Sequence, residues 1–257
     1  MFDNAVSRLN QGHTNNRDTH ILSDLYVPDR ATHLHEFSPD FDQFVGADWV
    51  VTGAGTAGLV AGDGGWLSVV SAVSAFQEVQ KTPANFSFTK GFRSWGAYQI
   101  ALDSLLGTVL IGLMNVTTTP FTPASQTDGC YFLTLANTGQ ITFNVAVGGV
   151  ITTVNTGSVL IPGAVPNANL YWYYDGGVYP GAPLGRIAWQ VDGPGVTVAT
   201  RGEVLVPATG TIAAFPGATL VAPVVAVNAT TAAARTLIVD RLYTAKDEVN
   251  INATQPF

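Results

Sequence analysis

Charged side chains are scarce in this sequence. Of its 257 residues, 29 are Asp, Glu, Lys or Arg, which is 11%, against about 25% in an ordinary soluble domain. Hydrophobic residues make up 47% of the same chain. A surface with so little charge predicts that part of it is covered, either by copies of the chain or by a larger assembly.

Positive charge is especially low. The chain has three lysines, Lys81, Lys90 and Lys246, and a net charge of −7. A nucleic-acid-binding protein needs a basic surface that displaces counterions from phosphates. We therefore expect no nucleic-acid partner.

Paired cysteines, a secretion signal and long hydrophobic runs are also missing. Cys130 is the single cysteine, so no intrachain disulfide is expected. The N-terminus has no basic start followed by an apolar core, and this predicts that it is not a signal peptide. The most apolar window, residues 105–116, is shorter than the roughly 20 residues that a membrane-spanning helix needs. We expect a buried strand there and no membrane partner.

Histidine is absent from most of the chain. His13, His20, His33 and His35 all lie near the N-terminus, so a Ser-His or Cys-His nucleophilic site in the remainder would lack its base. The later carboxylates include turn signals such as Asp128-Gly129, Asp175-Gly176 and Asp192-Gly193. This pattern predicts a protein that is not an enzyme, with no cofactor and no metal site.

The sequence after residue 48 has the pattern of an all-β protein. Residues 170–174 and 186–191 are aromatic and β-branched runs, and each ends in an Asp-Gly turn signal. Similar runs recur between clusters of Gly, Asn, Asp and Pro, whereas Gln77, Glu78 and Gln80 indicate a polar break. We predict an antiparallel β-sandwich with strands at residues 48–52, 66–74, 86–89, 99–103, 108–116, 130–136, 140–147, 150–154, 170–174, 186–191, 196–199, 220–227 and 236–244.

Residues 1–48 differ from the rest in composition. They hold 11 of the 29 charged residues and all four histidines. Gly, Asn and Pro residues interrupt any long helix, and the apolar residues between them are too few for a separate core. We therefore divide the chain into an extended N-terminal arm, residues 1–48, and a β-sandwich domain, residues 49–257.

The arm is the predicted partner-binding segment. The sequence does not decide which surface the arm contacts: the β-sandwich of its own chain, a sister subunit or a foreign protein. The residues expected to make this contact are Leu22, Leu25, Tyr26, His33, His35, Phe37, Phe41 and Phe44. His33 and His35 would share a face if this segment is a strand, which suits a metal ion, but the interpretation we favour is solvated or subunit-contacting histidines.

Residues 53–58 read GAGTAG, which formally matches the glycine motif of dinucleotide-binding proteins, and Glu78 lies near the position of a ribose-binding acid. That motif requires a helix after its third glycine. The following residues, LVAGDGGW, are too rich in glycine to form one. We predict a turn between two strands.

The aromatic residues offer a different functional hypothesis. Trp66, Trp95, Trp172 and Trp189, together with Tyr171, Tyr173 and Tyr174, would stack on sugar rings if they were exposed. In a sandwich of this size we expect them to fill the core or an interface.

Five segments together resemble the concanavalin-A-like jelly rolls. They are Asp128-Gly129-Cys130-Tyr131-Phe132, residues 140–147, the Thr-rich residues 152–156, Val191-Asp192-Gly193 and the late strand containing Asp240. The resemblance covers roughly residues 49–245. The closely spaced acidic triad of the family's glucanases has no counterpart, and neither does the metal-binding loop of legume lectins.

The remaining features are similar to those of non-enzymatic jelly-roll proteins of tailed bacteriophage particles. This resemblance implies a virion structural protein, a capsid decoration or cement protein that self-associates as a homotrimer, binds the major capsid protein and stabilises the head. Its location would be the capsid surface, and the host cytoplasm during assembly. The alternative is a carbohydrate- or receptor-binding, lectin-like module of a tail fibre or secreted protein, with a glycan as partner.

Overall fold

The computed structural model describes residues 33–37, 48–60, 65–88, 92–175, 186–205 and 219–248. In these residues the chain forms two antiparallel β-sheets, with a 3-10 turn at Pro123–Ser125. No helix in the described residues is long and apolar enough to cross a membrane. The predicted all-β sandwich is confirmed.

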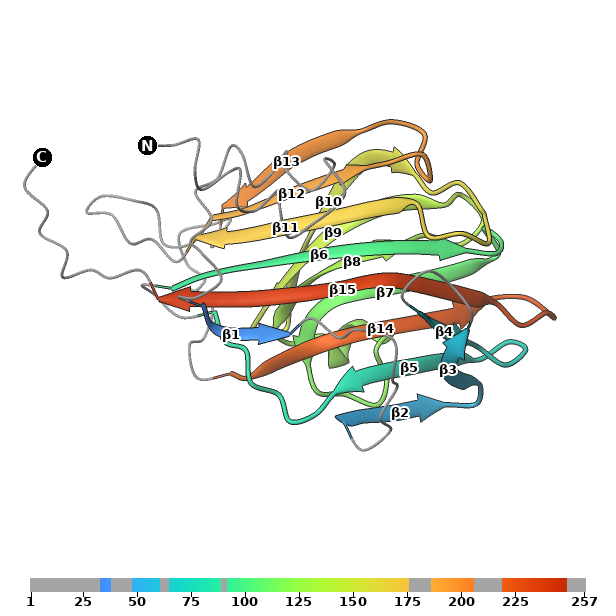
Figure 1. Ribbon diagram of the computed structural model, residues 1–257, viewed down its shortest axis with the longest axis horizontal. Helices are drawn as coiled ribbons and strands as arrows, with labels where there is room; N and C mark the ends of the chain where they lie inside the picture. The colour runs from blue at the N-terminus through green and yellow to red at the C-terminus, as the bar shows by residue number, and fades with distance from the viewer. Residues whose placement is uncertain are drawn as a thin grey trace, which may run out of the picture.

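Sheet A contains the long strands that cross the middle of the molecule in Figure 1. Strand β15 pairs with β4 near its start and with a short strand, β1, near its end. In spatial order the sheet consists of β13 (Thr200–Leu205), β12 (Arg186–Asp192), β11 (Ala168–Asp175), β6 (Phe92–Leu102), β15 (Thr236–Glu248), β4 (Trp66–Val70) and β3 (Thr56–Val60), with β1 at His33–Phe37.

Sheet B packs against sheet A. It has seven strands, and every neighbouring pair is antiparallel. In spatial order they are β10 (Val150–Val159), β9 (Gln140–Val147), β8 (Gly129–Thr134), β7 (Gly107–Asn115), β14 (Val221–Ala229), β5 (Phe76–Lys81) and β2 (Trp49–Gly53).

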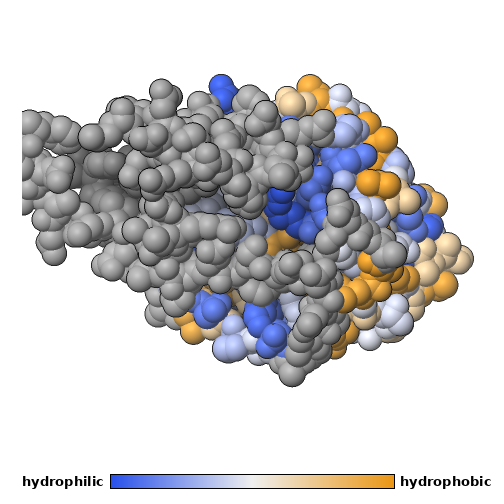
Figure 2. All heavy atoms as spheres, viewed as in Figure 1, coloured by the Kyte–Doolittle hydropathy of each residue, from blue (hydrophilic) through white to orange (hydrophobic). Residues whose placement is uncertain are grey.

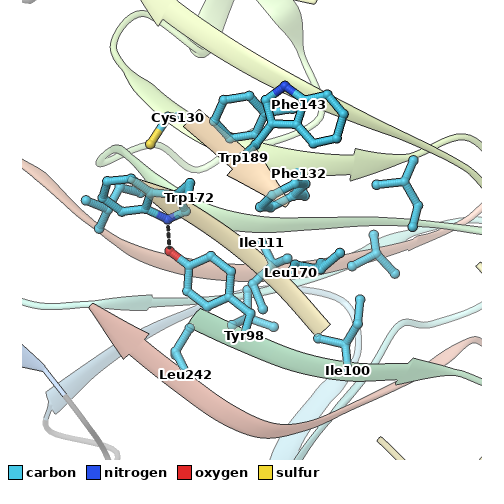
Figure 3. Close-up of a cluster of buried hydrophobic side chains, with 14 of the residues drawn as sticks. Tyr98, Ile100, Ile111, Cys130, Phe132, Phe143, Leu170, Trp172, Trp189 and Leu242 are labelled. Atoms are coloured by element: carbon cyan, nitrogen blue, oxygen red, sulfur yellow. Dashed lines mark hydrogen bonds between the residues drawn. The ribbon is translucent and has the colours of Figure 1, made fainter. Parts of the chain in front are cut away.

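The core lies between the sheets because alternate residues of each strand point inward. Its centre includes a fully buried Trp172, whose indole Nε1 donates a hydrogen bond to the Tyr98 hydroxyl at 2.7 Å (Figure 3). Cys130 is buried in the same cluster, and burial raises the pKa of its thiol. The chemistry of a reactive thiolate is therefore suppressed at this residue.

Most predicted strands are present, but several differ in length from the prediction: β6 begins at Phe92, seven residues before residue 99, and β10 ends at Val159, five residues after residue 154. Two predictions are wrong. Residues 196–199 form only an isolated bridge, from Val196 to Leu160, and the strand begins at Thr200. Of the predicted strand at 86–89 the structure describes residues 86–88, which contribute a single bridge, from Phe86 to Val221, and no strand.

Strands β3 and β5 were not predicted. Residues 76–81, interpreted as a polar break, form the strand β5, in which Gln77, Glu78 and Gln80 are all buried. Within the glycine motif, Gly53 ends β2, residues 54–55 form the turn, and Thr56–Gly58 begin β3, so the predicted turn is present but shorter than residues 53–58. Gly53 has φ +119°, and a Cβ there would lie 2.3 Å from the Phe76 carbonyl oxygen, which explains the requirement for glycine.

Candidate functional site

Part of the predicted partner-binding arm joins sheet A. The backbone of His33, His35 and Phe37 lies in β1, which pairs with β15 in a register that places Phe37 opposite Thr244. This segment therefore adds a strand to the chain's own sandwich. The other predicted contact residues, Leu22, Leu25, Tyr26, Phe41 and Phe44, lie outside the described residues.

The outer face of sheet A carries the most distinctive arrangement of polar and aromatic side chains. Leu170 and Trp172 of β11 point into the core, so Asn169 and Tyr171, one position away on the same strand, point outward. The strand register then aligns the outward residues of neighbouring strands in rows. One row, which we call the polar row, contains Asp192, Asn169, Gln99 and Arg241 on β12, β11, β6 and β15.

Asp192 is held at the end of the polar row by two amides. Asn169 Nδ2 donates to its Oδ1 at 2.9 Å, and Gln190 Nε2 donates to its Oδ2 at 2.6 Å. Asn169 and Gln190 are buried, whereas Asp192 is half-buried. The carboxylate is therefore fixed in orientation while part of it still faces solvent, and each oxygen has acceptor capacity left.

The Asp-Gly turn after β12 fixes this end of the strand. Gly193 has φ +100°, and a Cβ on it would lie 2.4 Å from the Asn167 carbonyl oxygen. The amide of Gly195 donates to the same carbonyl at 3.1 Å. The turn is thus packed against the start of β11, and this contact keeps Asp192 beside Asn169.

An aromatic cluster lies next to the polar row on the same face. It consists of Trp95 on β6, Tyr171 and Tyr173 on β11, and Tyr243 on β15, with Ala97 and Ala245 between them. Trp95, Tyr171 and Tyr173 are 3–5% exposed and Tyr243 is half-buried. The expectation that the aromatics are buried is confirmed for these three, but they lie outside the space between the sheets.

Three further aromatic residues of the same hypothesis are buried between the sheets, as expected. Trp172, Trp189 and Tyr174 belong to the core between the sheets. Among the residues that the structure describes, no three His, Cys, Asp or Glu side chains are grouped as a metal site would require.

The polar row was not predicted from the sequence. The relevant signal is present in β11 as Asn169, Tyr171 and Tyr173, and in β12 as Gln190 and Asp192, because residues two apart share a face of a strand. Which strand lies beside which, and in what register, is needed to join these residues into a row.

Three solved structures share this architecture. Lectin II from Ulex europaeus is 12% identical, with a TM-score of 0.55, and the match covers 84% of this chain and 100% of that one. The lectin from Bauhinia forficata in complex with GalNAc is 12% identical, with a TM-score of 0.50 and coverage of 84% and 99%. The endo-1,3-beta-glucanase from Streptomyces sioyaensis is 12% identical, with a TM-score of 0.55 and coverage of 87% and 99%.

No protein-family model and no curated protein matches the sequence. Identities this low carry information on the fold alone. Together with the two antiparallel sheets, they confirm the part of the resemblance that concerns architecture: the chain is a concanavalin-A-like β-sandwich.

Proposed function

We propose that this protein is a carbohydrate-binding module that holds a sugar at the polar row of sheet A. The observation that carries the proposal is the Asp192 carboxylate, fixed by Asn169 and Gln190 beside an aromatic cluster. A sugar has a rim of hydroxyl groups and apolar C–H faces. The carboxylate would accept hydrogen bonds from hydroxyls, and the half-buried Tyr243, on the same face of sheet A, would offer apolar ring surface.

The fold similarity supports this proposal only in a general way. Two of the similar structures are lectins, and one of them was solved with GalNAc. The glucanase shows that the same architecture also serves hydrolysis, so fold does not choose between binding and cleavage. Glycoside hydrolysis ordinarily uses two carboxyl groups across the bond, whereas the polar row contains one carboxylate, Asp192. We therefore propose binding without catalysis.

Replacing Asp192 with alanine tests the proposal. A charge-assisted hydrogen bond contributes about 1.5–3 kcal/mol, so we expect sugar affinity to fall by roughly 10- to 100-fold. The measurement is a glycan array, followed by calorimetric titration of the best sugar against wild type and Asp192→Ala. Asp103, an exposed carboxylate in the turn after β6, provides the matched control Asp103→Ala, which should bind like wild type. An array without any bound sugar, or equal affinity of Asp192→Ala and wild type, would contradict the proposal.

The virion hypothesis stays a prediction. The fold and the comparisons are silent on the capsid surface, the major capsid protein and the trimeric state, and its support is the low-charge composition together with the resemblance given above. Co-sedimentation of the purified chain with phage heads is the direct measurement, and a chain that remains in the supernatant would remove this hypothesis.

We also propose that the chain self-associates along the edge formed by β2 and β3. These strands are the outermost of sheets B and A and contain no charged residue. Figure 2 shows hydrophobic residues gathered at the lower right, where Figure 1 places β3. Val50, Val51, Leu59 and Val60 are each 38–47% exposed. Edge strands usually carry charges that block pairing with another chain, and here that protection is missing.

A lysine on this edge should prevent the association. We expect Val50→Lys to reduce the solution mass, measured by light scattering after size-exclusion chromatography, to that of one chain. Val73, which is 55% exposed in the turn between β4 and β5, provides the control Val73→Lys. A wild-type mass equal to one chain, or an unchanged mass for Val50→Lys, would contradict this assignment.

A further inference from the structure

The outer face of sheet B contains a buried carboxyl group without a hydrogen-bond partner. Glu78 lies at the middle of β5, is 0% exposed, and neither of its carboxyl oxygens has a hydrogen-bond partner among the described residues. Val79 points into the core between the sheets, so Glu78 points to the opposite side. Opposite it on the two neighbouring strands are Thr52 of β2 and Ala226 of β14.

A segment connecting β7 to β8, residues 116–128, lies over this part of the sheet, and we call it the strap. It contacts the residues on both sides of Glu78 on the same face of β5. The ring of Phe121 packs edge-on against Phe76, with centroids 6.3 Å apart, and the Thr117 amide donates to Gln80 Oε1 at 3.2 Å. Glu78 is thus enclosed between two points at which the strap touches β5.

Two residues outside the strap, Asn115 and Tyr131, hold it closed at its far end. Asn115 accepts hydrogen bonds from the amides of Thr127 and Asp128 through its Oδ1, and its Nδ2 donates to the Ser125 carbonyl. The Tyr131 hydroxyl donates to Gln126 Oε1. All of these contacts are made by neutral groups or by the backbone, so none of them compensates a negative charge on Glu78.

The described residues around Glu78 offer no counter-ion. The described residues of β2, β7 and β14 include no titratable side chain. The strap has Asp128, which accepts from the Gly148 amide, and β8 has Tyr131, next to Cys130 of the core. Lys81 of β5 lies 3.5 Å from Asp48 and, by strand alternation, on the opposite face from Glu78. Burial raises the pKa of Glu78 to about 8, because an ionised carboxylate in this place would be both desolvated and unpaired.

We propose that the strap is a pH-sensitive cover: it lies closed on sheet B while Glu78 is protonated, and it opens when Glu78 loses its proton. Opening lets water reach the carboxylate without breaking the pairing of β5 with its neighbours. It also uncovers apolar residues of the outer face, among them Leu110, Met114 and Val224. This behaviour depends on sheet B and is independent of the sugar site proposed on sheet A.

Hydrogen exchange of the strap amides tests the proposal in the full chain. Each opening would release one proton, so the protection of the Thr117 and Thr127 amides, corrected for the intrinsic exchange rate, should fall about tenfold per pH unit between roughly pH 6 and 8. Phe143, at the centre of β9, reports global unfolding and should keep higher protection throughout. In Glu78→Gln the protection of the strap amides should not change with pH.

Two variants separate the role of Glu78 from a general effect of mutation. Glu78→Met removes the ionisable group but keeps an unbranched side chain, so it should behave like Glu78→Gln. Asp103→Asn removes an exposed carboxylate and should reproduce the wild-type profile. Wild-type protection that does not change with pH, or a Glu78→Gln profile identical to that of wild type, would overturn the proposal.

Discussion

Replacing Gly96 with alanine is expected to destabilise the protein by about 3 kcal/mol, at the upper end for overpacking of a core. Gly96 pairs with Trp172 across β6 and β11. An added Cβ would lie 2.3 Å from Trp172 Nε1 and 2.6 Å from the Tyr98 hydroxyl, the two atoms of the buried hydrogen bond in Figure 3. Both side chains are 0–1% exposed, so neither can move aside without displacing its neighbours.

Gly58 provides the matched control. It is also a strand glycine, on β3, but a Cβ there meets nothing within 4 Å. Gly58→Ala should leave stability unchanged or raise it by about 0.4–1 kcal/mol, because alanine restricts the unfolded chain. Thermal unfolding would show the difference as a melting temperature lower by about 6–12 °C for Gly96→Ala. Equal melting temperatures of the two variants would mean that Gly96 is not a close-contact position.

The strands that could be predicted from the sequence are those in which hydrophobic residues and turn signals agree. The run at 140–147 was predicted with the same ends as β9, because its β-branched and aromatic residues are bounded by glycines. The strand predicted at 196–199 is wrong. Val196 and Val198 are β-branched residues typical of strands, but Val196 makes only an isolated bridge. Thr200–Leu205 contains Arg201, Gly202 and Glu203, which are unusual in a strand, and it is nevertheless the edge strand β13.

β5 is the opposite case, a strand that the sequence pattern did not predict. Gln77, Glu78 and Gln80 are typical of exposed loops, yet each is buried. The glutamines are compatible with burial because their amides have partners: Gln80 Nε2 donates to the Met114 and Asn115 carbonyls, and Gln77 Oε1 accepts from the Gly55 amide. These partners come from other strands and turns, so a linear pattern cannot reveal them.

Part of the candidate site could be predicted from the sequence, because the face of a strand on which a residue lies is a local property, whereas its neighbours on other strands are not. Strand alternation places Asn169, Tyr171 and Tyr173 on one face of β11 from the sequence alone. Their proximity to Asp192 and Trp95 depends on β11 lying between β12 and β6 in one register. Asn169 and Asp192 are 23 residues apart and Tyr173 and Trp95 are 78 apart, and pairing over such separations is set by packing of the whole sandwich, which a single sequence does not show.

The stability of the folded protein should fall as the pH rises from about 5 to 8. The pKa of Glu78 is raised from 4.5 to about 8 by burial. Above pH 4.5 the unfolded chain releases this proton while the closed native state keeps it, so the unfolded state binds fewer protons. The unfolding free energy then decreases with pH, by about 1.4 kcal/mol per unit, and the full interval would amount to at most about 5 kcal/mol. Below pH 4.5 both states are protonated and Glu78 contributes no slope.

Opening of the strap limits this loss of unfolding free energy. The limit therefore connects the pH dependence of stability with the hydrogen exchange of the strap amides. At high pH, keeping Glu78 protonated in the closed state costs more free energy than opening the strap. The carboxylate then ionises in an otherwise folded chain, and the decrease in unfolding free energy should level off at the pH where the Thr117 amide loses protection.

Urea unfolding at a series of pH values measures the slope of unfolding free energy against pH for wild type and for Glu78→Gln. The Glu78→Gln variant should lack the Glu78 component of the slope, so the stability difference between the two proteins should grow with pH. A difference that stays constant from pH 5 to 8 would show that the Glu78 carboxyl already ionises in the closed native state, and that its burial beneath the strap does not control stability.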